Sequence, residues 1–233
     1  MAEAFAHPDY LADPQWLIQH RQDHNLVIID VDSEAGYLRG HIPGARRLAD
    51  DYERDPSDGW VRTLPPEQFA RVCQRLNIGD ASRVVVYDNN RSLYAARFWW
   101  VLNFYGHQDV RVLDGGWRGW VTSGGGVSFD PAPAASDGIV FTPRMEPSFR
   151  ADLADVKSAC ALGDAIIWDT RSQPEYTGQE KRGHRHQGHI AGAVHLDWRD
   201  LMDRETHRFK SPSELSELLA RAGIAPDKPV YAY

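Results

Sequence analysis

The sequence has few cysteines, no excess of positive charge and no long apolar run, and each of these absences excludes a class of protein. Two cysteines among 233 residues form neither a disulfide framework nor a metal-site spacing. A formal net charge of -7 argues against electrostatic binding to nucleic acid or to a membrane surface. No apolar run approaches the roughly 20 residues of a membrane span, and the N-terminus lacks the pattern of a signal peptide. We therefore expect a cytoplasmic monomer without metal or cofactor.

Both cysteines are expected to be structural. Cys73, in EQFARVCQRL, and Cys160, in LADVKSACAL, each share a helical face with neighbouring apolar residues. Free cysteine is among the residue types most often buried. We therefore predict that both thiols lie in the core and that neither is a nucleophile.

Aromatic residues are plentiful, with eight tryptophans, so the chain must fold around a substantial core. It also repeats itself: VIIDVDSEAGYLRGHIPGARRL in the first half matches AIIWDTRSQPEYTG…QGHIAGAVHL in the second. Asp30 and Asp169 are 139 positions apart, whereas His41 and His189 are 148 apart. An insertion of nine residues within 177–187 accounts for the difference.

The repeat continues at an offset of 146, where LPPEQFARVCQRLNIGDASRVVVYD matches KSPSELSELLARAGIAPDKPVYAY. Each copy alternates apolar strands with amphipathic helices, which predicts a parallel sheet in an α/β fold. A segment rich in Gly, Pro, Ala and Ser separates the copies and is typical of a linker. We therefore predict a domain over 1–130, a linker over 131–145 and a second domain over 146–233.

The duplicated Gly-His-Ile-x-Gly-Ala turn, together with VLDGGWRGW after the first copy's apolar helix, resembles the rhodanese family. More narrowly, the chain is similar to two-domain thiosulfate and 3-mercaptopyruvate sulfurtransferases from about Trp16 to Tyr233. The resemblance implies two tandem rhodanese-like domains, each an open parallel sheet flanked by helices. It also implies a sulfurtransferase that moves a sulfane sulfur from thiosulfate, or a similar small anionic donor, to cyanide or a thiol.

In that family the catalytic cysteine directly follows the strand that corresponds to PVYAY. The resemblance therefore implies a cysteine immediately after Tyr233 that forms a persulfide, and no catalytic residue within 1–233. On this reading the second domain is cut off before its active-site loop, and PVYAY is expected to be a buried strand. The first copy has Asp88 at the nucleophile position, and a carboxylate is a poor sulfur nucleophile. We expect the first domain to be inactive.

Arg171 is the candidate substrate-binding residue. It follows Asp169 at the end of a strand, and the resemblance associates its position with the rim of the active site; the alternative is an ion pair at a domain interface. Glu175 stands where mercaptopyruvate-type members carry a second arginine, which favours thiosulfate as the donor. Asp30 and Asp169 are interpreted as structural residues that cap the turns after their strands.

The histidines are assigned structural or solvated positions. His41 and His189 are expected to bond the backbone of their turns. His184, His186 and His189 are interpreted as part of a solvated loop, because no nearby carboxylate or thiol completes a metal site. Trp198 could either line the active site or pack against other side chains.

Four alternatives remain beside thiosulfate sulfur transfer. The protein could use 3-mercaptopyruvate, serve as a non-catalytic rhodanese-like binding module, or be an inactive fragment. It could also be a relative of arsenate reductases or phosphatases, which have a longer loop after the cysteine.

Overall fold

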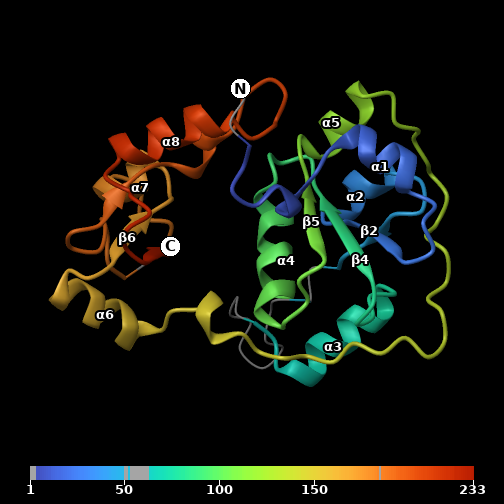
Figure 1. Ribbon diagram of the computed structural model, residues 1–233, viewed down its shortest axis with the longest axis horizontal. Coiled ribbons are helices and arrows are strands. Elements are labelled where there is room, and N and C mark those ends of the chain that lie inside the picture. The colour runs from blue at the N-terminus through green and yellow to red at the C-terminus, as the bar shows by residue number, and fades with distance from the viewer. Residues whose placement is uncertain (1–3, 50–51, 53–62, 184) are drawn as a thin grey trace. The chain divides into compact units, whose positions relative to one another are not determined.

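The computed structural model describes residues 4–49, 52, 63–183 and 185–233 of the chain. These divide into two compact units, drawn in Figure 1. The first unit consists of His7–Phe149 with Arg204–Arg208, and the second mainly of Arg150–Asp203 and Phe209–Tyr233. Each unit is a parallel sheet with helices packed on it, which confirms the predicted α/β fold.

The sheet of the first unit has five parallel strands in the order β1-β5-β4-β2-β3. Its central strands β4 and β2 are continuous apolar runs that are buried, as is typical of strands inside a parallel sheet. The strands are β1 (Leu11–Ala12), β2 (Leu26–Asp30), β3 (Arg46–Arg47), β4 (Arg83–Tyr87) and β5 (Val110–Leu113).

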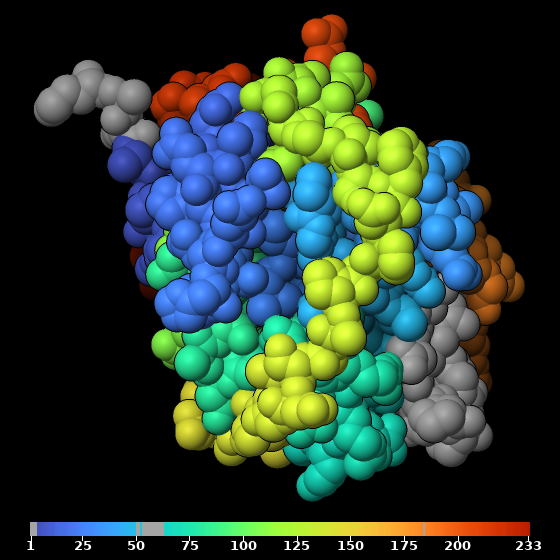
Figure 2. Space-filling view, turned by 90° about the vertical axis from the view of Figure 1, so that its right-hand side faces the viewer, coloured from blue at the N-terminus to red at the C-terminus, as the bar shows by residue number. Residues whose placement is uncertain are grey.

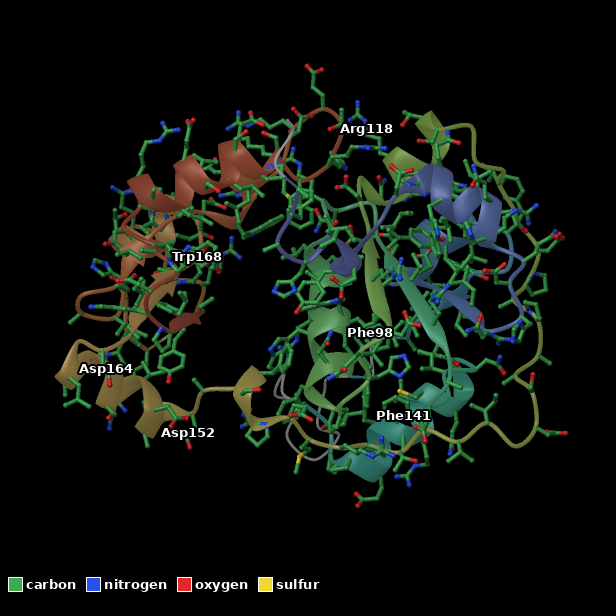
Figure 3. The ribbon with its side chains drawn as sticks, in the orientation of Figure 1. Phe98, Arg118, Phe141, Asp152, Asp164 and Trp168 are labelled. Carbon is green, nitrogen blue, oxygen red and sulfur yellow. The ribbon has the colours of Figure 1, made fainter. Side chains whose placement is uncertain are left out.

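Helices cover both faces of this sheet because successive side chains of a strand point to opposite faces. Val86 belongs to one buried cluster together with Phe98 of α4, a side chain labelled in Figure 3. Tyr87 belongs to a second cluster with Trp120 of α5. The helices are η1 (Pro8–Tyr10), α1 (Pro14–His20), α2 (Glu34–Leu38), α3 (Pro66–Arg75), α4 (Leu93–Phe104), α5 (Gly116–Thr122) and η3 (Pro147–Phe149).

The segment 131–145, which we predicted to be a linker, is bound along the first unit. Arg46 Nη1 donates to the carbonyl oxygen of Pro133 at 2.7 Å, and the backbone N–H of Ser136 donates to Asn77 Oδ1 at 2.7 Å. Figure 2 shows the yellow-green and yellow chain crossing the face of the unit. The segment forms no strand or helix of its own, so its carbonyl and N–H groups are available to these side chains. The first unit consequently extends to Phe149.

The second unit has three parallel strands in the order β7-β6-β8, which matches β3-β2-β4 of the first unit. Trp168 of β6, labelled in Figure 3, donates its indole N–H to the carbonyl oxygen of Leu196 at 2.9 Å. The elements are α6 (Leu153–Leu162), β6 (Ile166–Asp169), α7 (Gln173–Thr177), β7 (Val194–His195), η4 (Trp198–Leu201), α8 (Pro212–Arg221) and β8 (Val230–Ala232).

Two burial predictions are corrected in the second unit. Cys160 is exposed rather than in the core, because α6 turns Ala159 and Val156 toward the sheet. The strand predicted in PVYAY forms as β8, but Val230 is 38% exposed because β8 pairs only with β6 among the described strands. Cys73 is fully buried, as predicted.

No helix in the described part of the chain combines the length and the apolar character needed to cross a lipid bilayer.

Candidate active site

The Gly-His-Ile turn has the same internal bonding in both units. His41 Nδ1 donates to the carbonyl oxygen of Tyr37 at 2.9 Å, and His189 Nδ1 to that of Tyr176 at 2.8 Å. In each pair the two rings stack with their centroids 3.8 Å apart. Each tyrosine hydroxyl in turn donates to the backbone of the following Gly-Ala. The prediction that these histidines bond the backbone is confirmed.

In the first unit the loop after β4 closes around the side chain of Asp88. Its carboxylate accepts four backbone N–H groups: Asn90 and Ser92 on Oδ1 at 2.8 Å each, and Tyr94 and Ala95 on Oδ2 at 2.9 Å each. Asp88 itself is 1% exposed. N–H groups that converge at the start of a helix form an anion-binding site. Here an internal carboxylate fills that site, which we call the Asp88 cradle.

The Gly-Gly-Trp turn contacts the backbone of Asp88. The backbone N–H of Trp117 donates to the carbonyl oxygen of Asp88 at 2.9 Å. A Cβ atom on Gly116 would clash with that same oxygen, and the φ of Gly116 is +52°. Only glycine fits both the close approach and the backbone conformation, which accounts for this part of the motif.

The neighbouring strand end in the first unit is acidic. Tyr87 Oη donates to Asp30 Oδ2 at 2.6 Å and accepts the backbone N–H of Ile42 at 3.1 Å. Asp32 Oδ2 accepts the backbone N–H of Asn89 at 3.0 Å. Burial, followed by the charges of Asp30 and Asp88, raises the pKa of Asp32 to about 6. A cavity of about 430 Å³ opens here, lined by Asp30, Asp32, Ser33, Gly36, Arg39, Gly40, Asn89 and Trp117.

In the second unit the corresponding strand end carries Arg171, the predicted site residue. Its Nε and Nη2 donate to the two carboxylate oxygens of Asp169 at 3.0 and 2.6 Å, and Nη2 also donates to the carbonyl oxygen of Gly188 at 2.9 Å. The guanidinium carbon lies 5.1 Å from the centre of the Tyr233 ring. Burial alone would raise the pKa of Asp169, but the hydrogen bonds from Arg171 outweigh it and the pKa lies below its ordinary value.

Tyr233 takes the place in the second unit that Tyr87 takes in the first. Its hydroxyl accepts the backbone N–H of Ile190 at 3.0 Å, as that of Tyr87 accepts the N–H of Ile42. Sequence reasoning overlooked both tyrosines, although the 146-residue offset aligns them and could have drawn attention to them.

Glu175 is engaged in capping helix α7. Its Oε2 accepts the hydroxyl of Ser172 at 2.6 Å and the backbone N–H of the same residue at 3.2 Å. Arg182, in the inserted segment, places Nε 3.2 Å from Oε1. Both carboxylate oxygens of Glu175 are therefore used within the protein.

The histidine-rich insertion shows no metal site in the part of the chain that the structure covers, where no three potential ligands come together. His186 and His189 are exposed there, while His184 lies outside the described residues. Trp198 is half-buried.

Comparisons with known proteins agree on one family. The model of the rhodanese-like domain matches residues 13–123 and 152–233. The sulfur carrier protein TtuD of Thermus thermophilus is 32% identical over 98% of this chain and 83% of its own length. A putative thiosulfate sulfurtransferase, SseA of Mycobacterium tuberculosis, is 34% identical over 92% of this chain and 74% of its own.

A solved structure supports the same fold. The crystal structure of SseA from Escherichia coli, described among 3-mercaptopyruvate sulfotransferases, superposes with a TM-score of 0.84 at 26% identity. The match covers 96% of this chain and 87% of that one. Both rhodanese-like domains predicted from the repeat are therefore confirmed.

Proposed function

The chain belongs to the family of rhodanese-like domains, and on this premise we propose that it is a sulfurtransferase whose donor is thiosulfate. The acceptor is cyanide or a thiol, and the sulfur is carried as a cysteine persulfide on the residue that follows Tyr233. The observation that carries this proposal is the Asp88 cradle, because it displays in the first unit the geometry that an anionic nucleophile needs.

The equivalence of Tyr87 and Tyr233 supports the same geometry for the second unit. Asp88 follows Tyr87, and its carboxylate is held by four N–H groups at the start of α4. A residue after Tyr233 would begin a loop at the same place in the repeat. A cysteine there would have its thiolate stabilised by the converging N–H groups, which lower the pKa of a thiol.

The reaction then proceeds by two successive displacements. The thiolate attacks the outer sulfur of thiosulfate, the S–S bond breaks, and sulfite leaves with the electron pair. A thiolate or cyanide next attacks the outer persulfide sulfur, and the enzyme thiolate leaves. Arg171 supplies the cation for the anionic donor, since its guanidinium lies against the ring of Tyr233, next to the nucleophile's place.

The test is sulfur uptake by the full-length protein. Thiosulfate should add roughly 32 Da, one sulfur atom, and cyanide should remove it. Arg171→Ala should lower kcat/KM for thiosulfate by about 10- to 100-fold, as expected for lost hydrogen bonds to a charged group. Arg221→Ala is the matched control, because Arg221 lies on α8 with its side chain 71% exposed. A protein that takes no sulfur from thiosulfate would refute the proposal.

A second candidate donor is 3-mercaptopyruvate, favoured by the likeness to the Escherichia coli protein. Glu175 opposes it, because this position carries a carboxylate in place of a second substrate-binding arginine, and the nearby guanidinium of Arg182 is already paired with that carboxylate. Measuring sulfur uptake from both donors decides between them. Uptake from neither would favour the non-catalytic binding module.

A further inference from the structure

His195 contacts the backbone of Arg171 from the neighbouring strand. It lies on β7 opposite Asp169, and its Nε2 is 2.8 Å from the carbonyl oxygen of Arg171. A carbonyl oxygen only accepts hydrogen bonds, so Nε2 must bear the proton. The His195 ring also stacks on Tyr176, with centroids 4.5 Å apart. The ring contact therefore orients the imidazole while its N–H points at Arg171.

The first unit has a different residue at this place. Arg47 lies opposite Asp30 in β3, and its Nη1 donates to the carbonyl oxygen of the next residue, Leu48, at 3.4 Å. The residue that corresponds to Arg171 in that unit is Asp32. Of the two units, the one with the arginine at this turn, Arg171, is therefore also the one with a histidine on the neighbouring strand.

We propose that His195 is a positioning residue that holds Arg171 ready for the anionic donor. This inference rests on the proposed function. Asp169 and Gly188 fix the guanidinium, and His195 fixes the carbonyl of the same residue, so side chain and backbone are both held before substrate arrives. A binding group that is ordered in advance loses less conformational entropy when the ligand binds.

Two substitutions separate the hydrogen bond from the ring contact. His195→Phe keeps a ring against Tyr176 but has no donor, whereas His195→Gln keeps a donor near the place of Nε2 but has no ring. In the full-length protein we expect His195→Phe to lower kcat/KM for thiosulfate about fivefold, the value of one hydrogen bond. We expect kcat/KM for 2-mercaptoethanol, an acceptor with no anionic group besides its reacting thiolate, to stay unchanged and His195→Gln to behave like the wild type.

A double-mutant cycle tests whether the effect passes through Arg171. In an Arg171→Ala background, His195→Phe should cause no further loss with thiosulfate. A further fivefold loss there, or equal losses in the Phe and Gln variants, would overturn the proposal and leave His195 a packing residue.

A spectroscopic readout does not depend on turnover. Solvent exchange of the Arg171 Nε–H, followed by NMR, should accelerate in His195→Phe and stay slow in His195→Gln. Unchanged exchange in both variants would refute the positioning role. If the wild-type protein consumed no thiosulfate, the proposed function would fail while this measurement still decided the role of His195.

Discussion

The two units carry the same turn at the carboxyl ends of their sheets but opposite charges within it. Two positions after the strand aspartate, the first unit has Asp32 and the second has Arg171. In the first unit, burial and neighbouring carboxylates raise the pKa of Asp32, whereas in the second the arginine lowers the pKa of Asp169. The shared scaffold thus tolerates either charge, and function depends on the few residues placed in it.

A second difference concerns the role of the strand-end tyrosine. Tyr87 is fully buried and donates to Asp30, while Tyr233 is half-buried and has Arg171 over its ring. The strand end of the first unit therefore carries carboxylates beside an open cavity, and that of the second carries a partly exposed guanidinium. Substitutions at these positions test the difference between the two units.

The largest expected change is a gain of reactivity in the first unit. We expect Asp88→Cys to acquire one sulfur atom from thiosulfate, because the four N–H groups of the cradle would stabilise a thiolate. Intact mass should rise by roughly 32 Da. Asp88→Ser is the matched control, since both variants retain the exposed Cys160. Equal uptake in the two variants would show that the cradle alone does not support the chemistry.

The next largest effect is on stability. Asp88→Ala leaves four N–H groups around a buried site without their acceptor, and we expect the free energy of unfolding to fall by about 3 kcal/mol or more. Urea denaturation followed by tryptophan fluorescence measures it. Asp109→Ala is the control, because its side chain is 45% exposed and pairs with Arg83 at the surface, so its loss should stay below about 1 kcal/mol. Similar losses of stability in Asp88→Ala and Asp109→Ala would contradict a stabilising role of the Asp88 cradle.

The two tyrosines should differ in what their hydroxyls contribute. Tyr87→Phe removes a fully buried donor to Asp30 and should cost about 2 kcal/mol. Tyr233→Phe removes the acceptor for the N–H of Ile190 and an interaction with Asp169, whose carboxylate keeps its hydrogen bonds from Arg171, and at this half-buried position it should cost about 1 kcal/mol or less. Denaturation curves of the two variants compare them directly, and the reverse order would contradict the structure.

The smallest effect is pH-dependent. The pKa of Asp32 is raised from 3.8 to about 6, so the folded state binds more protons than the unfolded state and loses stability as pH rises through about 6. Asp32→Asn should therefore gain about 1 kcal/mol at high pH, allowing for partial exposure, and nothing below about pH 4. Denaturation at a series of pH values measures this. A gain of the same size below about pH 4, or no gain at high pH, would contradict the prediction.

Much of the fold could be predicted from the sequence, because the repeat is recognisable from short patterns of apolar residues, glycine and histidine. The strand ends at Asp30 and Asp169 and the two histidine turns were predicted, since apolar runs and Gly-His-Ile spacing encode them. Cys160 was misplaced because helical periodicity identifies an apolar face but not whether anything packs against it. The Asp88 cradle was also missed, because its donors are backbone groups that any residue supplies.

The duplicated α/β architecture, the family and the position of Arg171 after its strand could be predicted from the sequence, because they follow from the order and spacing of residues along the chain. The folded structure was needed to show that the Asp88 carboxylate occupies the anion site of its own loop and that segment 131–145 binds the first unit. It alone brought the imidazole of His195 to the carbonyl of Arg171. Those contacts join residues from different strands and loops, and their distances depend on register and packing rather than on separation in the sequence.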